Sequence, residues 1–232
     1  MSLLSRNLRL QIRKDANEAH AALAKQGTGL QNLTSISIFR HLIEKKQSEK
    51  FKKTPILAIE EPEAHLHPHA QRRLYKDLNQ TNIPVILTTH SPALVKYAAP
   101  SSLAVLRANS PDEVYAHQLS ATFPKENEKQ LSQLMRLDGA DVFFSRVIIA
   151  VEGDSELITL PYFAEQLGCD FDRDGVSIIS VGSFTSFEPI LRAFTKKELA
   201  AEIVVVYDQD VLHNSPKLVE QANKLGLVSE SD

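Results

Sequence analysis

The spacing of apolar residues divides the chain into two successive blocks of strands and helices. Short apolar runs predict strands at 55–59, 84–89, 147–151, 176–181 and 203–207. Segments with helical spacing predict helices at 33–46, 69–79, 92–97, 130–137, 155–167 and 187–194. The alternation of strand and helix predicts an α/β fold, with nearly continuous apolar strands buried on both faces of parallel sheets.

The remaining segments set the domain boundaries. An alanine-rich stretch predicts a helix over 3–25, which Gly27-Thr28-Gly29 ends. Runs at 103–107 and 114–119 flank turn residues and predict a hairpin. The polar segment 121–144 is interpreted as a linker, which separates a first domain at 1–120 from a βαβαβ domain at 145–232.

Composition is that of an ordinary globular protein. Hydrophobic residues make up 43% of the 232 positions, charged residues make up 24%, and the net charge is -3. Charge alone therefore does not indicate a nucleic-acid binder. The single cysteine, Cys169, excludes a disulfide within the chain, and no apolar run approaches the roughly 20 residues of a membrane span. We expect a cytoplasmic protein that does not associate with membranes.

Two acids follow the first predicted strand of the first block. The run 56–59 leads directly into Glu60 and Glu61, which places both carboxylates at the carboxyl end of a strand, where α/β folds bind their ligands. The first acid of such a Walker B pair can hold Mg²⁺ through water, and the second can polarise an attacking water. The alternative is a strand that ends in a solvated acidic turn.

The neighbouring motifs resemble those of ABC-type ATPases of the OLD (overcoming lysogeny defect) and RecF-like groups. Residues 61–68, Glu-Pro-Glu-Ala-His-Leu-His-Pro, resemble the segment after Walker B, and Leu-Thr-Thr-His-Ser-Pro at 87–92 resembles the switch-histidine motif about 30 residues later. The resemblance implies that Glu60 and Glu61 serve ATP and its Mg²⁺, with Glu61 catalytic, and that His90 contacts the γ-phosphate.

Gly27-Thr28-Gly29-Leu30-Gln31 resembles the signature motif of the same ATPases, although it departs from the common Leu-Ser-Gly-Gly-Gln form. The resemblance implies that Gly27, Gly29 and Gln31 contact the ATP of a partner protomer, so we expect a dimer or a larger assembly. The alternative is a simple turn between helices. Small residues at a helix N-terminus would let backbone N–H groups approach a phosphate.

No Gly-x-x-x-x-Gly-Lys-Ser/Thr segment is present in the 232 residues. In the family that phosphate-binding loop precedes all of the motifs above, so we expect a fragment or a truncated gene product that carries half of an ATP site. The alternate histidines His65, His67 and His69 do not match zinc-ligand spacings and have no cysteine near them. The resemblance instead identifies them with a dimer-facing loop.

A second set of acids follows two strands of the second block. Glu152 follows the strand at 147–151, Glu156 lies one helical turn later, and Asp208 and Asp210 follow the strand at 203–207. Two carboxylates 4 Å apart repel by about 1 kcal/mol in water and by about 4 kcal/mol at an effective dielectric of 20. Cations must therefore hold such a cluster together, and oxygen ligands favour Mg²⁺ or Mn²⁺. The alternative is a set of helix caps and solvated turns.

This second block resembles a Toprim domain, which has a Glu-Gly after one strand and Asp-x-Asp after a later one. The resemblance covers about 145–232 and implies that Glu152, Glu156, Asp208 and Asp210 bind two Mg²⁺ or Mn²⁺ ions, with Glu152 and Asp208 catalytic. An ABC-type half directly before a Toprim domain is the arrangement of the OLD family. The implied fold is the C-terminal part of an ABC-ATPase α/β domain followed by a Rossmann-like Toprim domain.

The second block also departs from that family. Val-Gly-Ser-Phe at 181–184 stands where OLD-like sequences often have Gly-Gly-Lys, and the chain ends 22 residues after Asp210, where family members continue. The resemblance thus implies a Toprim fold that is incomplete here. Lys196 and Lys197 are candidates for phosphate contacts, although paired surface lysines are usually only solvated.

The leading hypothesis is an ATP-linked, divalent-metal-dependent DNA endonuclease of the OLD family, with a role in phage defence or DNA repair. The alternative is a non-catalytic fragment, an ATPase-like module for dimerisation and DNA binding that has no phosphate-binding loop. A third interpretation, a RecF-type repair ATPase, leaves the second acidic cluster unexplained.

Overall fold

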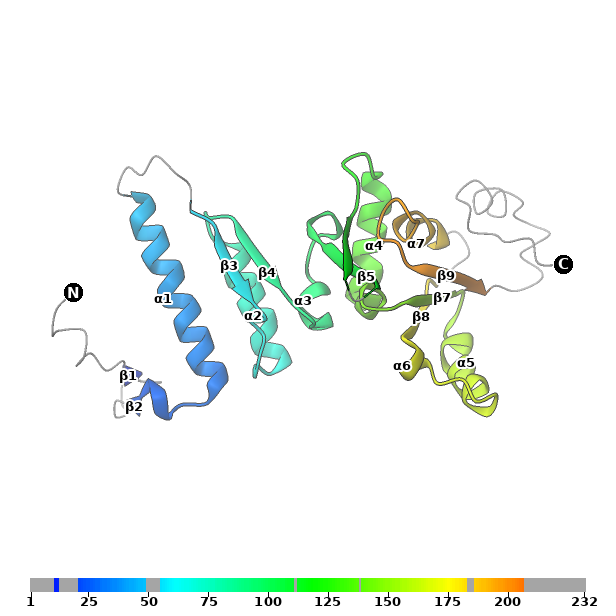
Figure 1. Cartoon of the computed structure of the whole chain (residues 1–232), viewed down its shortest axis with the longest axis horizontal. Coiled ribbons are helices and arrows are strands. Elements are labelled where there is room, and N and C mark those ends of the chain that lie inside the picture. The colour runs from blue at the N-terminus through cyan, green and yellow to red at the C-terminus, as the bar shows by residue number, and fades with distance from the viewer. Residues whose placement is uncertain are drawn as a thin grey trace. The chain divides into compact units, whose positions relative to one another are not determined.

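The computed structural model describes residues 11–12, 21–48, 55–110, 112–137, 139–182 and 186–206. The chain forms two compact units, 1–94 and 95–232. Both are α/β in character and contain parallel strands (Figure 1), as the apolar pattern predicts. No helix in the described residues is both long enough and apolar enough to cross a membrane.

The first unit contains a parallel pair of strands with helices packed on it. Its elements are β1 (Gln11–Ile12), β2 (Ala21–Ala22), η2 (Leu23–Lys25), α1 (Thr28–Ser48), β3 (Leu57–Glu60), α2 (Pro68–Asn79) and β4 (Val85–Thr88), and α3 (Pro92–Val95) spans its end. The small core groups Leu57, Ile83 and residues of α2 with partly buried residues of α1. The carbonyl of Asp77 in α2 accepts a hydrogen bond from Arg40 of α1 at 3.3 Å.

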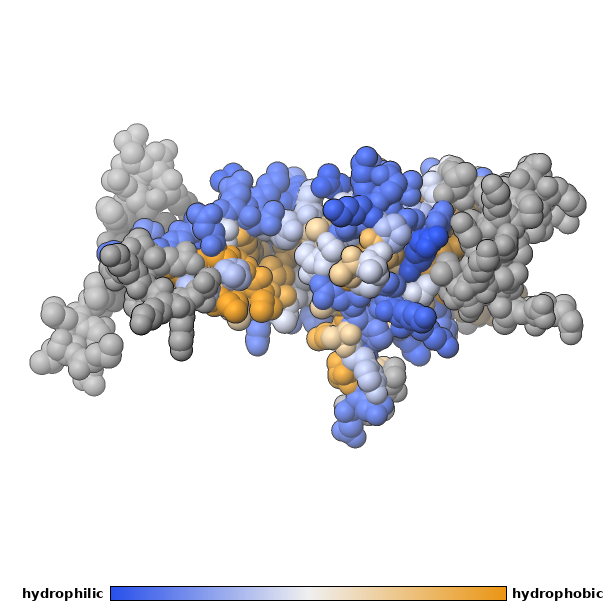
Figure 2. Space-filling model, turned by 90° about the horizontal axis from the view of Figure 1, so that it is seen from above, coloured by the Kyte–Doolittle hydropathy of each residue, from blue (hydrophilic) through white to orange (hydrophobic). Residues whose placement is uncertain are grey.

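Two expectations about the first unit are wrong. The predicted helix over 3–25 is contradicted at β1 and β2, which pair antiparallel; helix propensity is a weak preference that tertiary pairing overrides. Strands β3 and β4 are also not buried on both faces. Ile56 and Ile86 are 59% and 61% exposed, so one face of this pair is open. Figure 2 shows apolar residues, in orange, gathered on the surface of this unit.

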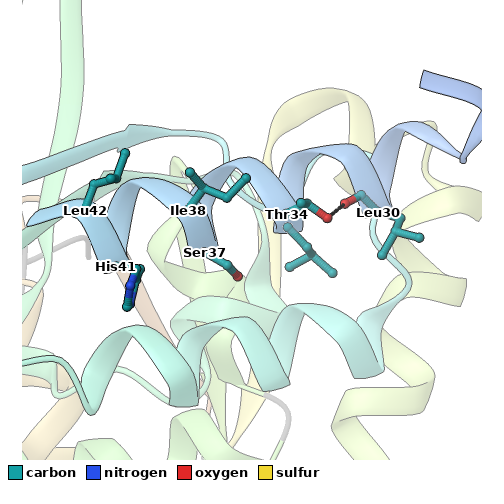
Figure 3. A pocket seen from close by; sticks show the side chains of 7 residues that line it. Leu30, Thr34, Ser37, Ile38, His41 and Leu42 are labelled. Atoms are coloured by element: carbon teal, nitrogen blue, oxygen red, sulfur yellow. Dashed lines mark hydrogen bonds between the residues drawn. The ribbon is translucent and has the colours of Figure 1, made fainter. Parts of the chain in front are cut away.

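Helix α1 adds an apolar surface of its own. Seven of its residues line a hollow of ≈ 550 Å³, among them Leu30, Ile38 and Leu42, and the Thr34 hydroxyl donates to the Leu30 carbonyl at 2.8 Å (Figure 3). The hollow lies along the helix surface rather than at the strand ends. It therefore belongs to the exterior of the unit and not to either acidic site.

The second unit is built on a parallel sheet with the strand order β8-β7-β9. Its elements are η3 (Pro100–Ser102), β5 (Ala104–Ser110), β6 (Glu113–Gln118), α4 (Lys125–Leu137), η4 (Gly139–Phe143), β7 (Val147–Val151), α5 (Asp154–Gln166), α6 (Phe171–Asp174), β8 (Val176–Ser180), α7 (Phe187–Ala193) and β9 (Glu202–Val206). The order β7-α5-β8-α7-β9 matches the predicted βαβαβ pattern, and β7 is the central strand.

The core of this unit is formed largely by α4, η4, α7 and one side of β7. Ile148 and Ala150 are fully buried, as are Phe187 and Ile190 of α7. Segment 121–144, interpreted as a linker, includes α4 and η4, both of which have buried residues. Leu131, Leu134 and Met135 of α4 pack into the core, whereas most of its polar residues and its last residue, Leu137, are exposed, as in an amphipathic helix.

Arg107 holds the β5–β6 hairpin to this core. Its guanidinium donates to the carbonyl of Leu199 at 2.8 Å and to the carbonyl of Ser145 at 2.7 Å. Both acceptor residues are buried, and burial lowers the pKa of Arg107 below its ordinary value. No carboxylate pairs with Arg107 in the part of the chain that the structure describes. Its function in the fold is to satisfy carbonyls.

Replacing this side chain tests that function. Arg107→Ala leaves two carbonyls of buried residues without donors, so we expect the free energy of unfolding to fall by roughly 2–4 kcal/mol. Arg136→Ala, on the exposed side of α4, is the control and should change it by less than about 0.5 kcal/mol. Urea denaturation of the two variants and the parent chain measures the difference. Equal stabilities for the two variants would contradict the assignment.

Candidate functional site

The carboxyl edge of the β8-β7-β9 sheet has the geometry of a ligand site. The chain passes from β7 to β8 on one side and then returns to β9 on the other side of β7. In open α/β sheets the crevice that binds ligands lies at such a reversal, outside the carboxyl ends of the strands. Val151, the last residue of β7, pairs with Val206, the last residue of β9, so both strands end at the same level.

Glu152 leaves β7 at this point of reversal. The residue is partly buried, and its Oε2 atom is shielded from solvent and has no hydrogen-bond partner among the described residues. A buried carboxylate oxygen without a donor is unfavourable by itself. The atom therefore suits a bound cation, and a carboxylate is the ligand type that Mg²⁺ and Mn²⁺ prefer.

Glu156 lies in the first turn of α5, close to Glu152 in the chain. Its Oε2 accepts the backbone N–H of Gly153, the N-cap residue, at 3.2 Å, which is the glutamate half of a capping box; the N-cap glycine has no side chain to supply the other half. The helix-cap interpretation of this acid is therefore realised, and it leaves the other oxygen free to bind a cation. Asp208 and Asp210 lie outside the described residues, so their place beside Glu152 and Glu156 stays a prediction.

Other predicted contacts of the second unit are only partly described. Gly182 follows β8 with a φ of 76°, in the left-handed region, while Ser183 and Phe184 lie outside the described residues. Lys196 and Lys197 are exposed in the turn between α7 and the start of β9, which pairs with the start of β7, so they lie towards the opposite edge of the sheet from Glu152. No group of three or more metal-binding side chains occurs in the described ranges, which omit Asp208 and Asp210.

The first unit brings its predicted ATP residues to one edge as well. Glu60 pairs with Thr88 in the parallel β3–β4 register, so Glu61 and His90 follow the two strands at the same end. The N–H of Glu61 donates to the Thr88 carbonyl at 3.1 Å, and the Glu61 Oε1 lies 3.8 Å from the His90 Nε2. Both side chains are exposed, at 58% and 85%, so they are open to a ligand.

Glu61 has an unusual backbone conformation. Its φ is 40°, and His65 in the same segment has a φ of 63°. Residues other than glycine rarely adopt these left-handed values, which cost roughly 1–3 kcal/mol each when the surroundings impose them. A groove of ≈ 390 Å³ lies beside Glu61, and Glu60, Pro62 and residues of α1 and β3 also line it.

The glycines of the signature-like motif differ in their surroundings. Gly27 is exposed, and a Cβ atom there would meet nothing within 4 Å. Gly29 is buried, and a Cβ atom there would lie 2.6 Å from the carbonyl oxygen of His65. At Gly29 the small size thus allows close packing on residues 61–67 of the same chain. The amide of Gln31 donates to the Gln26 carbonyl at 2.8 Å.

Glu63 is a candidate that the motifs alone did not single out. Its Oε1 accepts the Thr89 hydroxyl at 2.5 Å and the His90 N–H at 3.0 Å. The only sequence signal was its position within the segment that resembles the one after Walker B.

The alternate histidines of the same segment contact one another and a neighbouring arginine. The rings of His67 and His69 stack with their centroids 5.6 Å apart, and Arg72 hydrogen bonds to the His69 ring.

Comparisons with known proteins give two family matches, in separate parts of the chain. Residues 4–95 match the AAA ATPase domain family, and residues 143–210 match the TOPRIM domain of overcoming lysogenization defect protein-like proteins. The OLD nuclease of Thermus scotoductus is 27% identical over 88% of this chain and 39% of its own length. The Old nuclease of Escherichia phage P2 is 23% identical over 83% of this chain and 34% of its own length.

The chain therefore spans between a third and two fifths of the length of these two relatives. A solved C-terminal region of the Xanthomonas campestris pv. campestris OLD protein is 30% identical over 40% of this chain and 43% of its own, with a TM-score of 0.34. The ATPase family match contains the first pair of acids, Glu60 and Glu61, and the TOPRIM family match contains Glu152 and Glu156.

The contrast between Gly27 and Gly29 gives a matched test. Gly29→Ala places a methyl group against a backbone carbonyl, so we expect the free energy of unfolding to fall by about 1–3 kcal/mol. Gly27→Ala weakens a helix N-terminus but also lowers the entropy of the unfolded chain, and its net effect should stay below about 1 kcal/mol. Thermal and urea denaturation measure both. Equal effects would mean that α1 does not pack on residues 61–67 as described.

Proposed function

We propose that this chain, which has the ATPase–TOPRIM arrangement of the OLD family, supplies the nuclease centre and part of the ATP site of an ATP-linked, divalent-metal-dependent DNA endonuclease. The observation that carries the proposal is Glu152, whose buried oxygen has no hydrogen-bond partner among the described residues and lies at the reversal of a parallel sheet. In this proposal 1–120 is the ATPase part, 121–144 connects the two parts, and 145–232 is the nuclease domain.

The nuclease centre consists of four acids. Glu152, Glu156, Asp208 and Asp210 would hold two Mg²⁺ or Mn²⁺ ions, and their DNA substrate would bind at the carboxyl edge of the sheet. Two such ions supply an activated water and stabilise the leaving oxygen of a phosphodiester. Glu152 and Asp208 are the catalytic acids, because they follow the two paired strands most directly. Asp208 is two residues past Val206 in the chain.

The ATP part uses residues at the end of β3 and β4. Glu60 would hold the Mg²⁺ of ATP through water, Glu61 would polarise the attacking water, and His90 would contact the γ-phosphate. The exposure of Glu61 and His90 and the short distance between them support these roles. Gly27, Gly29 and Gln31 belong to the signature-like segment that would face the ATP of a second protomer. A dimer or larger assembly in the cytoplasm, acting in phage defence or DNA repair, completes the proposal.

The second candidate is a non-catalytic module for dimerisation and DNA binding, which would need neither a phosphate-binding loop nor a complete metal site. Cleavage assays on single-site variants distinguish the two functions.

The first assay separates the two sites. In the full-length protein, Glu152→Ala should lower the rate of plasmid cleavage in Mg²⁺ or Mn²⁺ by about 100-fold or more while ATP hydrolysis continues, because it removes ligand oxygens from one site only. Asp208→Ala should behave in the same way. Glu61→Ala should stop ATP hydrolysis and leave Mn²⁺ binding intact. Cleavage by Glu152→Ala at the wild-type rate would contradict the assignment of Glu152 to the metal site, whereas absence of metal-dependent cleavage by the wild-type protein would support the non-catalytic function.

A second assay separates the two roles of Glu156. Glu156→Gln keeps an oxygen that can accept the Gly153 N–H, so the thermal stability without metal should be unchanged. The affinity for Mn²⁺ should fall about tenfold or more, because an amide is a weaker ligand than a carboxylate. Calorimetric titration of this chain with Mn²⁺ measures the change, and Glu165→Gln, exposed on the same helix, is the control. Unchanged affinity would limit Glu156 to helix capping.

A further inference from the structure

Residues 61–67 contact two separate segments of the first unit. This connecting loop joins β3 to α2 and packs closely on Gly29 at the start of α1. The side-chain amide of Asn32 in α1 approaches the Ala64 carbonyl at 3.5 Å. On its other side, Glu63 contacts Thr89 and His90, which follow β4. The loop thus lies between the signature-like segment and the segment that carries the switch histidine.

Glu63 provides the contact to the histidine segment. One oxygen, Oε1, accepts both the Thr89 hydroxyl and the His90 N–H. The Thr89 hydroxyl in turn accepts the N–H of Ser91 at 3.0 Å, and the Ser91 hydroxyl donates to the side-chain oxygen of Gln71 at 2.6 Å. A single carboxylate therefore orients three consecutive residues around His90.

The other oxygen of Glu63, Oε2, is buried and has no hydrogen-bond partner in the described part of the chain. A group whose only purpose was stability would be better replaced by a fully satisfied or apolar side chain, because an unsatisfied buried oxygen is costly. Glu63 is itself partly buried, whereas the side chains of Glu61 and His90 are exposed. Its contacts act on the backbone of His90.

We propose that Glu63 is a positioning residue that couples the connecting loop to the switch histidine. Displacement of residues 61–67, for example through Gly29 and Asn32, moves the hydrogen-bonded His90 segment with it. Glu63 sets the distance between His90 and Glu61 without contacting the nucleotide. The catalytic part of this inference rests on the ATP site of the proposed function.

Amide hydrogen exchange tests the coupling in this chain, independently of ATP. Glu63→Ala should speed exchange at residues 89–91 by about tenfold, since the His90 N–H loses its acceptor. Glu63→Gln should restore most of the protection, because its amide oxygen can still accept. Asp77→Asn, on α2 in the same unit, is the control and should leave these amides unchanged. Unchanged exchange in Glu63→Ala overturns the coupling.

Steady-state kinetics of the full-length protein test its consequence. Glu63→Ala should lower the kcat of ATP hydrolysis by about tenfold or more with a KM for ATP within about threefold of the wild type, and Glu63→Gln should recover most of the kcat. Faster exchange with an unchanged kcat overturns the positioning role. A wild-type protein without ATP hydrolysis overturns the proposed ATP function and the positioning role with it, whereas the exchange result still decides whether Glu63 holds the histidine segment.

Discussion

Parallel pairing of strands is the constraint on which both candidate sites depend. In a parallel pair the residues that follow the two strands leave the sheet at the same edge, whereas an antiparallel pair would send them to opposite ends. The Glu60–Thr88 register brings Glu61 and His90 together in one unit, and the Val151–Val206 register sets the level at which Glu152 leaves the sheet in the other. Two chemically different sites thus have the same structural basis.

The sequence predicted the second unit well because its strands carry a strong burial signal. The run at 147–151 is observed as β7 with the same bounds, and it is the central strand of its sheet. The burial of the first unit was harder to predict. The apolar runs at 55–59 and 84–89 indicated strands, but nothing in these runs showed that one face would be open at Ile56 and Ile86. The alanines of 3–25 favoured a helix, yet Ala21 and Ala22 pair as a strand, because propensity decides little where pairing is available.

The contacts inside the first site could not be predicted from spacing. Glu63 and Thr89 are 26 residues apart in the sequence. Gly29 in α1 packs on His65 in the loop between β3 and α2, and the spacing of apolar residues gives no indication of this contact. A motif can indicate which residues serve a reaction, because it records their order and chemical type. It does not record which neighbours hold them, and those depend on close packing between backbones. The capping role of Glu156 is an intermediate case, since its spacing from Gly153 does carry that information.

The left-handed backbone of Glu61 has a consequence for how this segment can change over time. Glycine or asparagine would occupy a φ of 40° at lower cost, so mutation towards either would make the folded state more favourable while removing the carboxylate. Selection for folding stability alone would therefore favour replacement of Glu61. A glutamate is expected to persist at this position only while a separate selective pressure acts on its carboxylate, so under the proposed ATP role its presence in diverging descendants would indicate that hydrolysis is retained.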